Sequence, residues 1–331
     1  MSVKSRRNDG LTPRESKDFS SDEDLESLYR RGRALYLGEG CRKDVQKAAE
    51  LIKIAAEKGH AAAQYTFGYF CFYGIGVPVN KTATIMWYRQ SANQNYAEAQ
   101  YGLGYMCDVG DGIAMNKMEA AKWYYLAANS GHAKAQCNLG NLYYNGKGVR
   151  LDKAEAFRLF SLSAEQGNSD ALYNMACMIE SGDGVERDSV KALSYFEAAA
   201  STGDPNMLFM LGMKYLNGQG VRHNKKTAGR LFSIAAEKGH HEAQYHLGMM
   251  YLEGIGVEKD VATATDLFTL ASNQWNKDAI FRLGMIHLDN VHMEKDEKKG
   301  IGLLRLAAEL GSTDAVEVLE VYDRIRTSCR D

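Results

Sequence analysis

A block of 36 residues recurs along this chain without an insertion or a deletion, as the step from Gly32 to Gly68 shows. Each block carries a small residue at one fixed place, which we number zero. These marker residues are Gly32, Gly68, Gly104, Gly140, Ala176, Gly212, Gly248 and Gly284. A fixed period of this size is typical of stacked repeats, in which each unit buries its apolar face only against its neighbours. The period therefore predicts one repeat domain.

Polar residues fall where a pair of helices would begin in each repeat. Position −8 holds Asp24, His60, Tyr96, His132, Asn168, Asp204, His240, Asn276 and Ser312. Position +12 holds Asp44, Asn80, Asn116, Asp152, Asp188, Asn224, Asp260 and Asp296. Most of these side chains can accept hydrogen bonds from the free amides of a helix's first turn. We therefore expect helix A of each repeat to begin after position −8 and helix B after position +12.

Glycines mark the expected helix ends. A G-x-G pair begins six residues after the marker in seven repeats, from Gly38/Gly40 to Gly254/Gly256, and glycine tolerates the positive φ that ends a helix. Helix B carries alanine pairs such as Ala127-Ala128. We expect these pairs to face the repeat glycine and so let the two helices approach closely. A last helix from about Ser312 to Arg326 would cap the stack.

The repeated pattern A-x-A-Q-Y-x-L-G-x-x-Y-x-x-G-x-G-V-x-x-D-x-x-K-A resembles the Sel1-like repeat, a relative of the tetratricopeptide repeat. It is almost complete over residues 135–156 and 243–264, and it departs at Trp275, Asn290 and His292. The resemblance implies an all-α, right-handed solenoid of eight helical hairpins plus the capping helix. Its A helices would line a concave groove. Family members serve as scaffolds in signalling, in protein quality control and in regulation of cell-wall enzymes.

The sequence gives little support for chemistry. The G-x-G pairs lack a third glycine and follow helices, so they indicate helix ends and not phosphate loops. Histidines His60, His132 and His240 occupy a capping position, and they lie too far apart to share one metal ion. No nucleophile and base form a recognisable motif. We therefore predict a protein that is not an enzyme and that uses no metal and no cofactor.

The candidate binding surface is a stripe of helix A formed by positions −3, +1 and +4, which share a face at 100° per residue. Position −3 also has a packing interpretation, which we favour, but positions +1 and +4 vary between repeats. Large apolar residues that vary there indicate protein binding. The predicted groove residues are Tyr36, Tyr65, Tyr69, Phe72, Tyr101, Tyr105, Tyr144, Tyr173, Met213, Tyr245, Met249, Leu252, Phe281 and Met285.

Composition limits the class of partner. Lys and Arg number 40 against 42 Asp and Glu, so the dense basic surface that nucleic acids require is lacking. Position −6 is mostly acidic, which would favour a partner with Lys or Arg. We expect protein or peptide partners, no nucleic acid and no membrane insertion. The chain itself would be a monomer or associate weakly.

Boundaries and location follow from the ends of the chain. We expect a disordered tail over residues 1–21, the solenoid over 22–327 and a short tail over 328–331. Ser20 and Ser21 precede acidic residues and are candidate phosphorylation sites. The N-terminal residues have no apolar segment like that of a secretory signal. The cysteines show no disulfide framework. These features favour the cytoplasm or nucleus over secretion.

The leading hypothesis is thus a scaffold or adaptor that binds proteins through its groove. One alternative is a binder of small molecules or cell-wall ligands, or a hydrolase of the cysteine-rich, β-lactamase-like type. Members of that type carry two cysteines eight residues apart in each repeat, a spacing absent here. A second alternative is a regulatory subunit of a ubiquitin-ligase or signalling complex.

Overall fold

The computed structural model describes residues 24–289 and 296–328. The predicted N-terminal tail with Ser20 and Ser21 lies outside these residues, as do the altered turn at Asn290 and His292 and residues 329–331.

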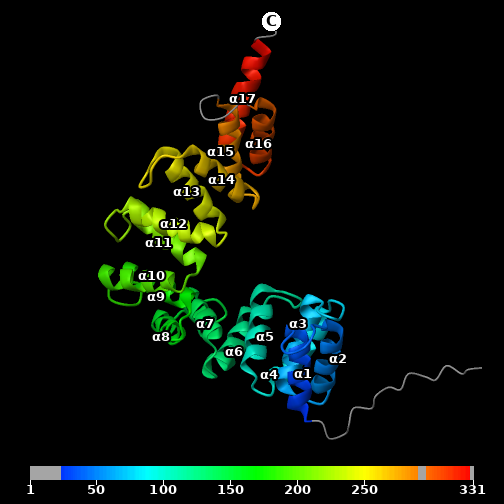
Figure 1. Cartoon of the computed structure of the whole chain (residues 1–331). Coiled ribbons are helices and arrows are strands. Elements are labelled where there is room, and N and C mark those ends of the chain that lie inside the picture. The colour runs from blue at the N-terminus through cyan, green and yellow to red at the C-terminus, as the bar shows by residue number, and fades with distance from the viewer. Residues whose placement is uncertain (1–23, 290–295, 329–331) are drawn as a thin grey trace, which may run out of the picture. The chain divides into compact units, whose positions relative to one another are not determined.

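Within the described ranges every regular element is a helix, and there are seventeen of them (Figure 1). Their bounds are α1 (Leu25–Leu37), α2 (Val45–Glu57), α3 (Ala61–Tyr73), α4 (Lys81–Ala92), α5 (Ala97–Val109), α6 (Lys117–Asn129), α7 (Ala133–Asn145), α8 (Lys153–Ala164), α9 (Ser169–Ser181), α10 (Ser189–Ser201), α11 (Pro205–Asn217), α12 (Lys225–Glu237), α13 (His241–Glu253), α14 (Val261–Ser272), α15 (Lys277–Leu288), α16 (Glu297–Glu309) and α17 (Thr313–Ser328).

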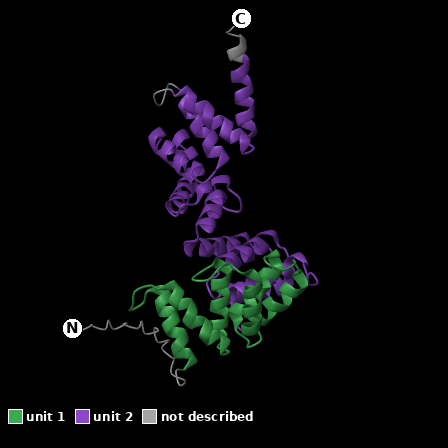
Figure 2. Ribbon diagram, turned by 90° about the vertical axis from the view of Figure 1, so that its right-hand side faces the viewer, with its two compact units in different colours: residues 1–127 green, residues 128–331 purple. Residues whose placement is uncertain are grey.

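The helices pack as successive hairpins, in which an odd-numbered helix A is followed by an even-numbered helix B, as in α3 with α4 and α13 with α14. The contacts divide the chain into two compact units, residues 1–127 and 128–331, which Figure 2 colours green and purple. Each unit has its own buried clusters. The all-α fold of repeated hairpins agrees with the prediction.

Most helices begin at a side-chain cap, at the repeat positions −8 and +12 that the sequence predicts. All eight Asp or Asn side chains at position +12 accept a hydrogen bond from a backbone N–H in the first turn of helix B. The three histidines at position −8 do the same through Nδ1, as in the bond from the Ala63 N–H to His60. Tyr96 is the exception, because its ring packs against Tyr65 instead, with 5.6 Å between centroids.

Both glycines of each G-x-G pair have positive φ, which confirms their role in ending helix A. The second glycine also allows a close approach to the preceding repeat. A Cβ atom at Gly76 would lie 2.3 Å from the carbonyl oxygen of Val45 at the start of α2. Trp275 holds the same left-handed conformation at a helix B end, with φ of 63°, where most other repeats have glycine.

The prediction that the repeat glycine faces the alanine pair is wrong. The glycine lies against the residue at position +20, which is aromatic in six repeats. A Cβ atom at Gly248, for example, would lie 2.7 Å from Cε1 of Phe268, a fully buried ring. In the five hairpins that have both the glycine and an aromatic residue at position +20, the ring therefore packs close against the backbone of helix A, where glycine has no side-chain atoms.

Candidate functional site

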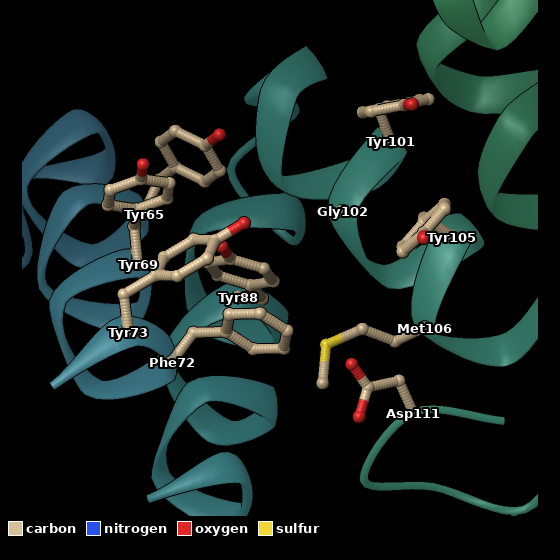
Figure 3. Close-up of a pocket in the computed structure, with 10 residues that line it drawn as sticks. All are labelled: Tyr65, Tyr69, Phe72, Tyr73, Tyr88, Tyr101, Gly102, Tyr105, Met106 and Asp111. Atoms are coloured by element: carbon tan, nitrogen blue, oxygen red, sulfur yellow. The ribbon is translucent and has the colours of Figure 1, made fainter. Parts of the chain in front are cut away.

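Unit 1 contains an open pocket of about 400 Å³ between α3, α4 and α5, shown in Figure 3. Six of its residues are tyrosines. The lining consists of Tyr65, Tyr69, Phe72, Tyr73, Tyr88, Tyr101, Gly102, Tyr105, Met106 and Asp111. Tyr69, Phe72 and Tyr73 project from α3 on one side, and Tyr101 and Tyr105 project from α5 on the other. The pocket is thus a cleft with an aromatic wall on each side.

Tyr88 connects the pocket to the repeat core. Its side chain comes from α4, is only 6% exposed, and stacks on Tyr65 with 5.1 Å between ring centroids. Tyr65 in turn contacts Tyr96 at the start of α5. These contacts favour the packing interpretation of position −3, since the ring is held between its own helix B and the next helix A. The same ring pairing recurs at Tyr101 with Tyr124 and at Tyr173 with Phe196.

Burial favours the protonated form of three phenols of the pocket, those of Tyr65, Tyr69 and Tyr88. Burial raises the pKa of Tyr65 to about 12, with a further contribution from Glu98, and burial also raises the pKa of Tyr69 and Tyr88. The hydroxyl of Tyr88 makes no hydrogen bond to any described residue. A buried phenol that faces a pocket without a partner can donate to or accept from a bound molecule.

Asp111 is the one charged residue in the lining. Its Oδ1 atom pairs with Lys81 of α4, whose Nζ lies 5.6 Å from the ring centroid of Phe72. Lys81 itself does not line the pocket. The ammonium therefore lies beside both an aromatic ring and a carboxylate at the pocket edge, an arrangement in which each partner stabilises the charge.

Unit 2 contains a pocket at equivalent positions, 72 residues further along the chain. It has a volume of about 260 Å³ and is lined by Asn141, Tyr144, Asn145, Phe160, Asn174, Cys177 and Met178. Tyr69, Phe72, Tyr73, Tyr88, Gly102, Tyr105 and Met106 are their counterparts in unit 1. The repeat thus provides one recurring hollow, which is larger and far more aromatic in unit 1.

The structure brings together five of the predicted groove residues, namely Tyr65, Tyr69, Phe72, Tyr101 and Tyr105, in the first pocket. Tyr144 lines the second. The others lie elsewhere along their units.

Among these others, Tyr36 packs against Phe70, and Met213 joins the main buried cluster of unit 2. Tyr245, Met249 and Leu252 pack together against a second cluster, and Met285 is exposed. Phe281 is only 8% exposed and packs against Ile301 and Leu304, so it offers little surface to a partner.

Five lining residues were not predicted from the sequence: Tyr73, Tyr88, Gly102, Met106 and Asp111. Two of them stand out in the sequence as departures from the repeat pattern. Gly102 is the only glycine at position −2, and Asp111 is one of two aspartates between the glycines of a G-x-G pair. Tyr88 and Met106 are periodic apolar residues of buried helix faces, and nothing in the sequence distinguishes them from core.

The described part of the chain has no cluster of metal ligands, and burial suppresses the reactivity of two of its cysteines. No group of three or more His, Cys, Asp or Glu in residues 24–289 and 296–328 could hold a metal ion. Burial raises the pKa of Cys137 to about 12 and also raises that of Cys177, so these thiols are poor nucleophiles. None of the described helices is both long and apolar enough to cross a membrane.

The Sel1 repeat family model matches eight successive segments of the chain. They cover residues 25–60, 61–96, 97–132, 133–168, 169–204, 205–240, 241–274 and 277–312. These segments agree with the eight hairpins of the structure, each of which begins at helix A.

Two solved structures of repeat proteins are similar over most of the chain. A Sel1 repeat protein from Oxalobacter formigenes has a TM-score of 0.69 and 29% identity, covering 80% of this chain and 77% of that one. The protective antigen c5321 of uropathogenic Escherichia coli has a TM-score of 0.68 and 29% identity, covering 91% of this chain and 65% of its own.

The chitin synthase regulator SKT5 of Saccharomyces cerevisiae is 33% identical over 72 residues, which is 20% of this chain and 10% of the yeast protein. The chain therefore spans a tenth of that relative and about two thirds of the Escherichia coli antigen.

Proposed function

Because the chain belongs to the Sel1 repeat family, whose members generally act as protein-interaction scaffolds, we propose that it is a non-enzymatic adaptor that binds a peptide segment of a partner protein at the aromatic pocket of unit 1. The observation that carries the proposal is the pocket itself. Six tyrosines and a phenylalanine gather around one open hollow, and four of these seven rings lie at positions other than −3 and +20, where aromatic residues recur in most repeats.

Aromatic side chains suit this role for physical reasons. Tyrosine offers a large apolar area with few rotatable bonds, and it is enriched among the residues that dominate binding energy. Tyr105 is 46% exposed, and Tyr73 is 58% exposed, at the two sides of the cleft. Such exposed rings around one hollow indicate a surface that a partner covers.

The cysteines suggest where the adaptor works. The described cysteines Cys41, Cys71, Cys107, Cys137 and Cys177 are all free thiols. Free thiols suit a reducing compartment, and we propose the cytoplasm or nucleus. The short similarity to a chitin synthase regulator makes a regulatory subunit of an enzyme complex the second candidate.

The test is a selection of peptides from a random library on the purified full chain, followed by calorimetry with individual peptides. We expect selected peptides to lose at least about tenfold in affinity for the double variant Tyr69→Ala, Tyr105→Ala, since both rings lie in the pocket. Tyr125→Ala is the control, because Tyr125 is at least as exposed as Tyr69 and Tyr105 but lies outside the pocket on α6. Unchanged affinity in a double variant that keeps its circular dichroism spectrum would refute the proposed site.

A further inference from the structure

The pocket of unit 1 is larger than its counterpart in unit 2, and it lacks a side chain at position −2, where the counterpart has Asn174. At position −2 the side chain covers the preceding repeat's rings: His246 packs against Phe209 and Phe232, with centroids 5.5 and 5.7 Å away. The hydroxyl of Thr66 similarly lies 3.3 Å from that of Tyr29. At Gly102 there is nothing to cover Tyr88, so this ring lies directly against the backbone of α5.

In unit 2, a side chain occupies the position that corresponds to Gly102. Asn174 stands where unit 1 has Gly102, and its Nδ2 atom donates to Asn141 Oδ1 at 3.1 Å and approaches Cys137 Sγ at 3.9 Å. A glycine inside a helix destabilises it by about 1 kcal/mol relative to alanine. Gly102 therefore weakens α5 locally and in exchange lets the ring of Tyr88 lie against the helix backbone at the base of the pocket.

A second difference leaves a carboxylate oxygen without a partner in unit 1. In unit 2, Asp183 binds Lys153 through Oδ1 and accepts a hydrogen bond from Tyr144 Oη through Oδ2, at 2.8 Å. In unit 1, Asp111 binds Lys81 through Oδ1 in the same way. The counterpart of Tyr144 is Phe72, which has no hydroxyl, so Oδ2 of Asp111 makes no hydrogen bond to any described residue.

Asp111 is the only charged residue in the lining, and the one cation described at the pocket edge, Lys81, is paired with it. Asp111 supplies a free carboxylate oxygen, the ring faces carry negative partial charge, and no Lys, Arg or His lines the pocket. Glu98 lies near enough to Tyr65 to contribute to its raised pKa. The ammonium of Lys81, held between Asp111 and the Phe72 ring, shows how a cation is bound at this edge.

We propose that the pocket of unit 1 receives a basic side chain, lysine or arginine, of the partner peptide, which binds Oδ2 of Asp111 and packs its stem between the rings of Phe72 and Tyr105. The proposal rests on the proposed function, because it specifies which residue of a bound peptide enters the pocket. The hydroxyl of Tyr88 is then available to a polar atom of the same peptide. The equivalent hollow of unit 2 lacks this specificity, since Tyr144 already satisfies Asp183 and Asn174 fills the space.

The test uses short probes of known charge with the full chain. The probes are three pentaglycine peptides, acetylated and amidated at their ends, in which the central residue is arginine, lysine or citrulline. Citrulline has nearly the shape of arginine but no charge, so it is the neutral control. Selective labelling of methionine methyl groups with ¹³C gives Met106 as an NMR reporter inside the pocket, assigned with a Met106→Leu variant. We expect the arginine and lysine peptides to shift the Met106 signal at millimolar concentration and the citrulline peptide to bind about tenfold more weakly.

Two variants transfer the unit 2 residues into unit 1. Phe72→Tyr adds only the hydroxyl that occupies the carboxylate oxygen, and it should reduce binding of the basic peptides to the level of citrulline while leaving citrulline unchanged. Gly102→Asn adds the missing side chain and should abolish binding of all three. If Gly102→Asn fails to fold, Phe72→Tyr still decides the question, because it adds a single atom that the repeat already accommodates at the equivalent Tyr144.

The outcomes separate this inference from the proposed function. Equal binding of the arginine and citrulline peptides overturns the inference, and so does the absence of any shift with basic peptides. If library peptides still bind in a manner that depends on Tyr69 and Tyr105, the proposed function survives that loss. If basic probes bind but no library peptide does, the pocket is a cation site and the peptide-adaptor function fails.

Discussion

Replacing the repeat glycine by alanine should destabilise unit 2, although alanine is the better helix former. At Gly248 in α13 the new methyl group would lie 2.7, 3.0 and 3.2 Å from three carbons of the Phe268 ring. Carbon atoms pack at about 3.5–4.0 Å, so the ring must move by roughly 1 Å. Phe268 is fully buried, so its ring can move only by displacing the side chains that surround it.

The expected change in the free energy of unfolding is the difference between two opposing contributions. Overpacking a dense core costs about 1–3 kcal/mol, and contact with three ring carbons puts this site in the upper part of that range. The gain in helix propensity is about 1 kcal/mol. We therefore expect Gly248→Ala to lower the free energy of unfolding by about 1–2 kcal/mol.

Gly302 in α16 is the matched control, because a Cβ atom there would meet nothing within 4 Å. Gly302→Ala should raise the free energy of unfolding by about 0.5–1 kcal/mol. Both variants lie in the same unit, so urea unfolding followed by far-UV circular dichroism compares them directly. Phe268→Leu, made alone and together with Gly248→Ala, completes a double-mutant cycle. We expect a favourable coupling, because the smaller side chain relieves the contact.

The reasoning would be refuted if Gly248→Ala were as stable as the unchanged chain. It would also fail if the cycle showed no coupling between the two positions, because the cost would then arise somewhere other than the ring contact.

Three further outcomes follow from burial and backbone geometry. Trp275 is 67% exposed and has a φ of 63°. Trp275→Gly should therefore raise the free energy of unfolding by about 1 kcal/mol, measured as a higher urea midpoint. An unchanged midpoint would argue against backbone strain at this residue. Iodoacetamide at pH 8 should label the exposed Cys41 rapidly and spare Cys137, whose pKa is raised by burial to about 12, as mass spectrometry of the folded chain can show. Burial lowers the pKa of His246, so the unfolded chain binds the proton more readily than the folded chain. The free energy of unfolding should therefore fall as the pH drops below about 6.5. His246→Met should reduce this pH dependence, as urea unfolding at pH 7.5 and 5.5 can show.

Much of the fold could be predicted from single positions of the repeat, each considered by itself. The Asp and Asn residues at position +12 and the positive-φ glycines act within one turn of their own helix, so their roles are readable locally. The contact of Gly248 with Phe268 was missed because it joins two helices, and its geometry depends on how they cross. The alanine pairs were the wrong partner for the same reason.

The candidate site was less predictable than the fold. The stripe of positions −3, +1 and +4 contains five of the pocket residues, because face sharing on one helix follows from its period. Tyr88 lies on a different helix, and its exposure to the pocket depends on what is missing at Gly102. An absent side chain leaves no apolar pattern to detect. Phe281 shows the converse, since a residue of the correct column is buried by its neighbours.

The two equivalent hollows, 72 residues apart, have a consequence for how such a chain can change its partners. Position −2 and position +4 determine whether a hollow is open and whether its carboxylate is free, yet neither position caps a helix or closes a hairpin. In the proposed mode of binding, the positions that set specificity are therefore different from those that begin and end the helices. On this proposal, a repeat array can acquire or lose a binding site by a few substitutions at such positions while the architecture stays fixed, so relatives with the same fold can differ in which of their repeats bind.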